Sequence, residues 1–182
     1  MSAPPAPELP YFEGYGPTVE AQVRKLLESG RLGDYLQERH GEGHAIRTDS
    51  ALMEATQALK ARYLRSSPPL HRVRYDPKLQ VVRDALGLHL RTARVHGSRL
   101  RSSREIRIDL VFREAPAAFL RMILVHELAH LREADHDKAF YQLCTHMEPD
   151  YFQLEFDLRL YLTYLAQGGA PFTPPTGGAP RP

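Results

Sequence analysis

The chain has 182 residues, of which 42% are hydrophobic and 25% charged, and its formal net charge is +2. These proportions are typical of a globular protein, and the length suits one domain better than two. The single cysteine, Cys144, excludes an internal disulfide framework and a zinc site made of several cysteines. We find no signal peptide and no apolar run of ~18 residues that would span a membrane, so we expect a cytoplasmic protein without membrane contact.

The N-terminal end of the chain is rich in proline, and the C-terminal end is rich in proline and glycine. Residues 1–10 and 168–182 therefore predict disordered tails, because such segments bury too little apolar surface to become ordered. Between them, residues 11–167 are predicted to form a single domain.

The first part of this domain, residues 17–66, is predicted to be helical. An apolar stripe indicates a helix that begins near Pro17 and ends at Gly30. A short helix is expected over residues 32–39. Thr48 opens a cluster of residues that is typical of a helix N-cap, and a third helix follows it.

Residues 71–112 change from a helical to an alternating pattern, which predicts strands. Val73 and Tyr75 alternate with arginines, and apolar and polar residues alternate again over 106–111. Because turn-forming residues lie between these two segments, we expect a small antiparallel sheet.

Residues 116–167 predict three further helices. The central helix opens at Pro116 and runs to about Leu131, a second covers about 137–147, and the last ends near residue 167. The elements together indicate an α+β fold, in which the small sheet packs on the central helix beside the N-terminal helices.

The central helix carries the motif His-Glu-Leu-Ala-His. His126 and His130 lie four residues apart and therefore project from one face of the helix. In this H-E-x-x-H pattern two neutral imidazoles bind zinc and the carboxylate, here Glu127, acts as general base. His136 follows a predicted helix break, so the chain can turn back and supply a third nitrogen. We predict one catalytic zinc ion bound by His126, His130 and His136.

Three protein ligands leave one coordination position for water, as in catalytic zinc sites. Glu127 is expected to take a proton from this zinc-bound water as it attacks the substrate. Candidates for a further transition-state donor are Tyr141, Tyr151, His89 and Arg94. Candidate acids that orient the ligand histidines are Glu148, Asp150, Glu155 and Asp157.

Four stretches of the chain resemble sequences of one known family: FLRMILVHELAHLREADHDKAFYQLCTHMEPDY, DALGLHLRTARVHGS, EIRIDLVFREAP and RLGDYL. This is the YgjP-like metallopeptidase-domain family, which is related to the WLM and SprT-like metalloprotease domains. The resemblance covers most of the chain outside the tails. The resemblance implies a zincin-like metallopeptidase fold and makes His136, ahead of Lys138, the third ligand. The family tends to carry Arg-Trp-Gly-Ser where this chain reads Arg-Val-His-Gly-Ser from Arg94, which leaves the role of that segment open.

The motif and the resemblance predict a zinc-dependent metallohydrolase, first of all a metallopeptidase that cleaves peptide bonds in proteins or peptides. A second interpretation is hydrolysis of a phosphoanhydride in a nucleoside triphosphate such as UTP, which has been proposed within the family. A third is a non-catalytic zinc-stabilised or DNA-associated binding module. Glu127 argues against the third, because a structural site needs no carboxylate beside an open position.

The positive charge is unevenly distributed. Residues 60–107 hold thirteen Lys or Arg against three acidic residues. Such a segment favours contact with nucleic acid or another anion, whereas the alternative is a solvated, arginine-rich surface.

Overall fold

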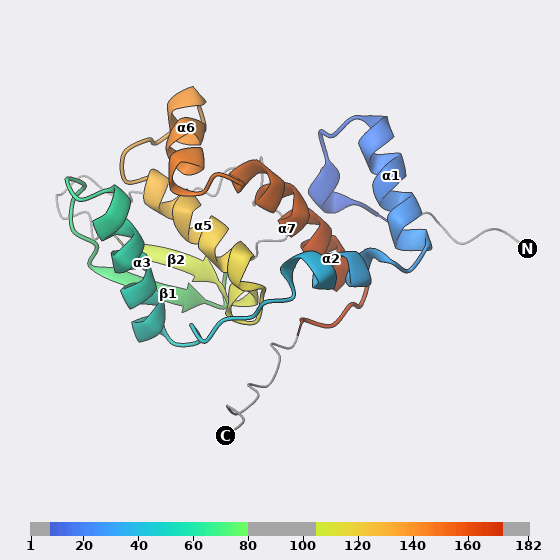
Figure 1. Ribbon diagram of the computed structural model, residues 1–182, viewed down its shortest axis with the longest axis horizontal. Helices are drawn as coiled ribbons and strands as arrows, with labels where there is room; N and C mark the ends of the chain where they lie inside the picture. Colours follow the sequence, from blue (N-terminus) through green and yellow to red (C-terminus); the bar gives the residue numbers. More distant parts are fainter. Residues whose placement is uncertain (1–7, 80–104, 173–182) are drawn as a thin grey trace, which may run out of the picture.

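The computed structural model describes residues 8–79 and 105–172 (Figure 1). Its α-helices are α1 (Pro17–Glu28), α2 (Leu32–His40), α3 (Asp49–Tyr63), α5 (Ala117–Ala129), α6 (Lys138–Met147) and α7 (Tyr151–Ala166). Its strands are β1 (Arg72–Asp76) and β2 (Glu105–Asp109), and short 3-10 helices cover η1 (Pro10–Phe12) and η2 (Leu110–Arg113).

The N-terminal helices confirm the sequence-based prediction. α1 begins at Pro17 and is followed by Gly30, whose φ of 68° is a conformation that glycine adopts without strain. The Thr48 side chain accepts a hydrogen bond from the backbone N–H of Ala51 at 3.2 Å, which caps α3 as its sequence indicates. The local signals at these helix ends therefore determine where the chain turns.

The two strands pair in parallel, with Val73 opposite Ile106 and Tyr75 opposite Ile108. The prediction of an antiparallel sheet is therefore wrong. A parallel pair needs a crossover of a dozen or more residues rather than a tight turn, and residues 77–104 are long enough to provide one. Most of that connection, residues 80–104, lies outside the described ranges. Alternating burial is the same in either strand direction, so the pattern could not reveal the orientation.

The second strand is also shorter than its alternating pattern indicates. The Asp109 side chain accepts a hydrogen bond from the backbone N–H of Val111 at 2.8 Å. This local bond turns the chain into η2, so Leu110 and Val111 leave the strand. The expected sheet boundary at residue 112 is wrong for this reason.

The central helix α5 is buried on nearly every side and forms the middle of the core (Figure 1). It packs against β2, α3, α6 and α7. Although its residues are mostly apolar, neither α5 nor another helix in the described part of the chain is long and apolar enough to cross a lipid bilayer. Polar side chains such as His126 and Glu127 are exceptional on so apolar a helix, and they indicate a functional site.

A buried aspartate connects α7 to α2. Asp157 is fully buried and accepts a hydrogen bond from His40 at 2.7 Å. Arg39 lies 3.4 Å from the same carboxylate, and the Gln153 side chain donates to its other oxygen at 2.9 Å. These contacts satisfy a charge that would otherwise be unfavourable in the core.

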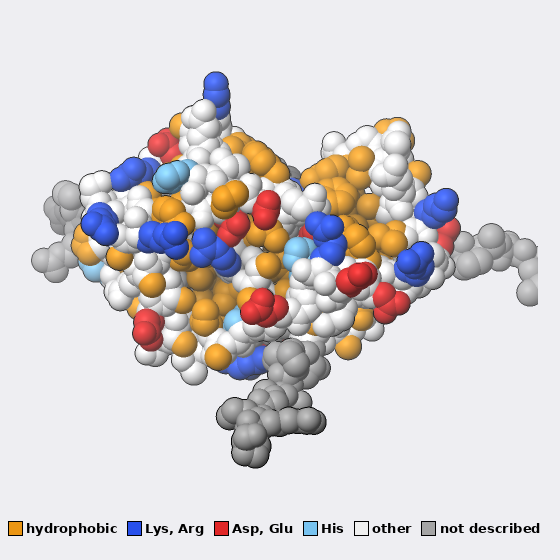
Figure 2. Space-filling model, in the orientation of Figure 1, with side chains coloured by type: hydrophobic (Ala, Val, Ile, Leu, Met, Phe, Trp, Pro, Cys, Tyr) orange, Lys and Arg blue, Asp and Glu red, His pale blue; other side chains and the backbone are white. Residues whose placement is uncertain are grey.

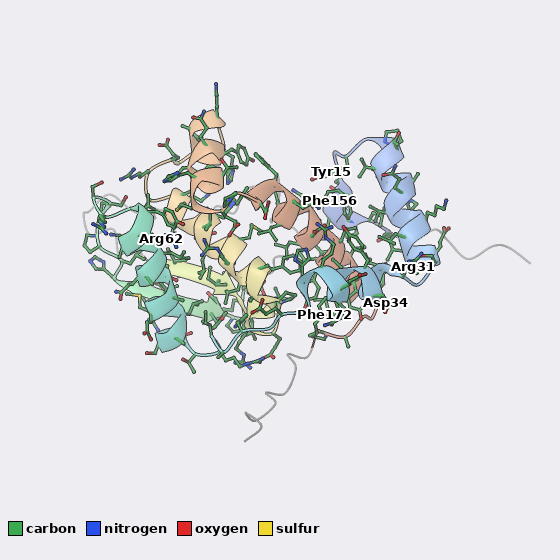
Figure 3. The ribbon with its side chains drawn as sticks, in the orientation of Figure 1. Tyr15, Arg31, Asp34, Arg62, Phe156 and Phe172 are labelled. Carbon is green, nitrogen blue, oxygen red and sulfur yellow. The ribbon has the colours of Figure 1, made fainter. Side chains whose placement is uncertain are left out.

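The described structure reaches into both predicted tails. Leu9 is buried at the start of η1, and Phe172 packs against the rings of Tyr161 and Tyr164. On the other side of α7, Phe156 meets Tyr15 with ring centroids 5.9 Å apart (Figure 3). Aromatic packing therefore fixes the segments just before α1 and just after α7.

Candidate metal centre

Three histidines meet at the end of the central helix. His126 and His130 come from the last turn of α5 and its C-cap, and His136 from the segment that leads to α6. The Nε2 atom of His136 lies 3.1 Å from Nε2 of His130 and 3.2 Å from Nε2 of His126. Each residue offers one ligand atom within 4.8 Å of the others, so the structure brings the three predicted ligands together.

The spacing of these nitrogens fits one metal ion. Two ligands of a tetrahedral zinc ion with bonds of about 2.0–2.1 Å lie about 3.3 Å apart. The two Nε2 separations of 3.1 and 3.2 Å match this value closely. Neutral imidazoles suit zinc, although other divalent transition metals accept the same ligands.

The turn between α5 and α6 places His136. His130 Nδ1 hydrogen-bonds the backbone carbonyl oxygen of Glu133 at 2.9 Å, which holds the turn against the end of α5. The Asp137 side chain then accepts hydrogen bonds from the backbone N–H groups of Ala139 and Phe140 at 2.9 and 3.0 Å. This N-cap starts α6 directly after His136, so the third imidazole is delivered by a short, well-defined turn.

The aromatic ring of Phe140 packs against all three imidazoles. Its side chain is fully buried, and its ring centroid lies 5.0, 4.6 and 4.6 Å from the centroids of His126, His130 and His136. The ring is therefore in packing contact with all three imidazoles.

Burial favours the neutral form of His126 and His130, which is the form that binds metals. Burial lowers the pKa of His126 to about 3, with smaller contributions from His130 and His136. Burial also lowers the pKa of His130. A cation in place of protons would therefore meet ligands that need no deprotonation at neutral pH.

Glu127 is partly buried beside this cluster and has no hydrogen bond or ion pair with any residue of the described ranges. Its burial raises the pKa of the carboxyl group to about 8. An acid without a protein partner in a buried place is unfavourable for stability alone, and this arrangement is typical of functional sites.

Among the described residues, no hydrogen bond joins any of the predicted acids to His126 or His130. Glu148 pairs with Arg121, Glu155 with Arg159 and Asp157 with His40, whereas Asp150 directly precedes α7. The partners observed are neutral: the carbonyl of Glu133 for His130, and the hydroxyl of Tyr151 for His126 at 2.7 Å. From the sequence, Tyr151 was predicted only as a possible transition-state donor. Tyr151 and His126 are 25 residues apart, and no local pattern shows that the hydroxyl contacts Nδ1 of this imidazole.

The structure places the candidate transition-state donors differently. The ring of Tyr141 lies beside that of His136, with centroids 6.4 Å apart, so it stays a candidate. The Tyr151 hydroxyl contacts Nδ1 of His126, whereas the Nε2 atoms face one another. His89 and Arg94 lie outside the described residues.

Only part of the basic segment 60–107 is described. Basic side chains gather over α3 on the face shown in Figure 2, and the guanidinium carbon of Arg62 lies 5.0 Å from the centroid of the Tyr63 ring (Figure 3). Arg74 pairs with Glu105 at 2.5 Å, so that cation is already compensated within the sheet. Contact of this segment with nucleic acid or another anion stays a prediction.

Comparison with known proteins agrees with the predicted resemblance. The family described as "YgjP-like, metallopeptidase domain" matches residues 33–161, a range that includes all three histidines and Glu127. A protein of Escherichia coli (strain K12) described as "UTP pyrophosphatase" is 54% identical over 160 residues, which cover 88% of this chain and 96% of that protein. No solved structure matches the chain.

Proposed function

The chain belongs to the YgjP-like metallopeptidase-domain family, and from this premise we propose that it is a zinc-dependent hydrolase with Glu127 as its general base. The observation that carries the proposal is the set of three Nε2 atoms at the spacing of zinc ligands, next to a carboxylate that has no partner within residues 8–79 and 105–172. A structural zinc site would have no use for that carboxylate.

The residues of the site divide the chemistry between them. His126, His130 and His136 would hold the zinc ion, which would supply a water of lowered pKa and a Lewis acid for the bond under attack. Glu127 accepts a proton from the attacking water and returns it to the leaving group. The Phe140 ring packs against the imidazoles beside this carboxylate.

Among substrates we place a nucleoside triphosphate first, with UTP as the compound to test. The support is the bacterial relative named for UTP, which is 54% identical over almost its full length. Sequence reasoning alone placed peptide bonds first, and the family's description still supports a peptidase as the second candidate. Both reactions use the same water and the same base, so the metal site alone does not separate them.

Two exposed cations belong to the segment that carries the third ligand. Arg132 donates hydrogen bonds to the hydroxyls of Ser66 and Ser67 at 2.7 and 3.0 Å, and Lys138 is the first residue of α6. The same segment also carries three acids, Glu133, Asp135 and Asp137, so its charges do not separate an anionic substrate from a peptide.

The proposal is tested with the zinc-loaded wild type and Glu127→Gln. Each is assayed against UTP, with UMP, UDP, pyrophosphate and phosphate resolved, and against unfolded casein. We expect equal zinc content and hydrolysis of UTP by the wild type, with a loss of about 10²–10⁴-fold in kcat for Glu127→Gln. Glu54→Gln is the matched control, since this exposed side chain on α3 has no hydrogen bond or ion pair among the described residues, and it should keep full activity.

Each other outcome has a definite meaning. Casein cleavage without UTP hydrolysis, abolished by Glu127→Gln, replaces the nucleotide with a peptide substrate. Undiminished activity of Glu127→Gln removes Glu127 as the base. Zinc binding without any hydrolysis by the wild type supports the binding module instead.

A further inference from the structure

We propose that Tyr151 is a positioning residue for the metal site: its hydroxyl holds His126 in the tautomer that leaves Nε2 free for the metal. The inference rests on the metal site of the proposed function. It concerns how this chain's own residues prepare one ligand.

The contact between Tyr151 and His126 is short and buried. Tyr151 is the first residue of α7 and only 1% exposed, and its hydroxyl oxygen lies 2.7 Å from Nδ1 of His126. The planes of the two rings are within 15° of each other. The hydroxyl therefore contacts Nδ1 of His126, whereas Nε2 of the same ring faces the other histidines.

The direction of this hydrogen bond determines the tautomer. A neutral imidazole carries one proton, so Nε2 can bind a metal only when Nδ1 holds that proton and donates it. The Tyr151 oxygen must then be the acceptor. If Tyr151 instead donated to Nδ1, the proton would lie on Nε2 and block the ligand position.

A metal ion at Nε2 would fix this direction. The single ring proton could then lie only on Nδ1, where the Tyr151 oxygen is in position to accept it.

Tyr151 thus does for His126 what the Glu133 carbonyl does for His130. Hydrogen bonds of this kind fix the ring and the tautomer of a metal-binding histidine. Both partners are neutral, so they orient the imidazoles without placing a negative charge behind them. A purely structural role for Tyr151, as packing beneath Tyr141 and Phe152, would need the ring but not the hydroxyl.

The test is Tyr151→Phe, which removes the hydroxyl and keeps the ring. We expect zinc affinity, measured by competition with a chelator, to fall about 10–100-fold. The matched control is Tyr161→Phe, another fully buried tyrosine of α7, which packs on Phe119 and Phe172. It should leave zinc affinity unchanged, and thermal unfolding of both metal-free variants shows that each is folded.

A spectroscopic readout separates positioning from packing. In the cobalt-loaded protein, the ring N–H protons of the ligand histidines give shifted proton resonances whose exchange with solvent is measurable. We expect the Nδ1–H of His126 to exchange slowly in the wild type and much faster in Tyr151→Phe, while that of His130 is unchanged. Assignment of the wild-type proton to Nε2 of His126 would contradict the inference even without a variant.

Failure of this inference can be told from failure of the proposed function. If the wild type binds no divalent metal at the histidines, both are wrong. If it binds zinc, and Tyr151→Phe matches Tyr161→Phe in affinity and exchange, only the role of Tyr151 is overturned.

Discussion

At the scale of single residues, the surroundings of Glu127 are the clearest sign of the candidate metal site. Its carboxyl group has no protein partner among the described residues, and burial raises its pKa to about 8. A partly buried charge without a partner among these residues lowers stability, which supports the proposed role of Glu127 as general base.

This cost predicts a pH-dependent stability difference in the metal-free protein. The folded chain holds the Glu127 proton more tightly than the unfolded chain, whose reference pKa is 4.5. The contribution of Glu127 is therefore fully present below pH 4.5 and is lost as the pH rises through about 8. We expect metal-free Glu127→Gln to equal the wild type at pH 4 and to exceed its free energy of unfolding by on the order of 1–3 kcal/mol at pH 8. Denaturant unfolding at both pH values measures it, and a difference independent of pH would show that burial does not perturb this acid.

Cys144 gives a second prediction at this scale. The side chain is fully buried and its burial raises the pKa of the thiol to about 12, so the reactive thiolate is absent at neutral pH. We expect no reaction with a thiol reagent at pH 7.5 in the folded protein and one equivalent after denaturation. Rapid labelling of the folded chain would show that the interior around α6 opens readily.

At the scale of elements, the start of α6 matters most for the site. Asp137 caps this helix through two backbone N–H groups and follows His136 directly. We expect Asp137→Ala to lower the free energy of unfolding by about 1 kcal/mol and to weaken zinc binding, because the turn that presents His136 loses its anchor. Asp137→Asn keeps a capping side chain and is the control. Equal zinc affinity for all three proteins would mean that the cap does not position His136.

The same scale shows what local sequence can and cannot predict. Helix ends were predictable because their signals are local, as with Thr48 at the start of α3 and Pro17 at the start of α1. The direction of β2 was not, since it depends on a connection through residues 77–104 rather than on the strand itself. The turn at Asp109 was missed because one side-chain hydrogen bond overrides an alternating pattern.

The candidate site divides in the same way. His126, Glu127 and His130 were predictable from one helical turn, and His136 from the short break that follows it. Their supporting partners depend on how α7 packs against α5, which no local pattern contains. The sequence therefore named acids, whereas the structure places the hydroxyl of Tyr151 there.

At the scale of the whole molecule, the buried Asp157 links the two ends of the domain. It joins α7 to α2 through His40, and its carboxylate is fully shielded from solvent. We expect His40→Ala to lower the free energy of unfolding by about 1–3 kcal/mol, because it leaves a buried acceptor without its closest partner. Arg39→Ala is the control: its side chain is 46% exposed, so its loss should matter by less than about 1 kcal/mol. Equal effects of the two changes would contradict this ranking.

The central claim is that three histidines of this chain hold one metal ion, and crystals of the zinc-loaded protein test it most directly. Anomalous diffraction at the zinc edge should show one peak about 2.0–2.1 Å from the Nε2 atoms of His126, His130 and His136, with Glu127 beside it and not bound. A peak that lacks any of the three histidines, or that lies on other residues, would contradict the account.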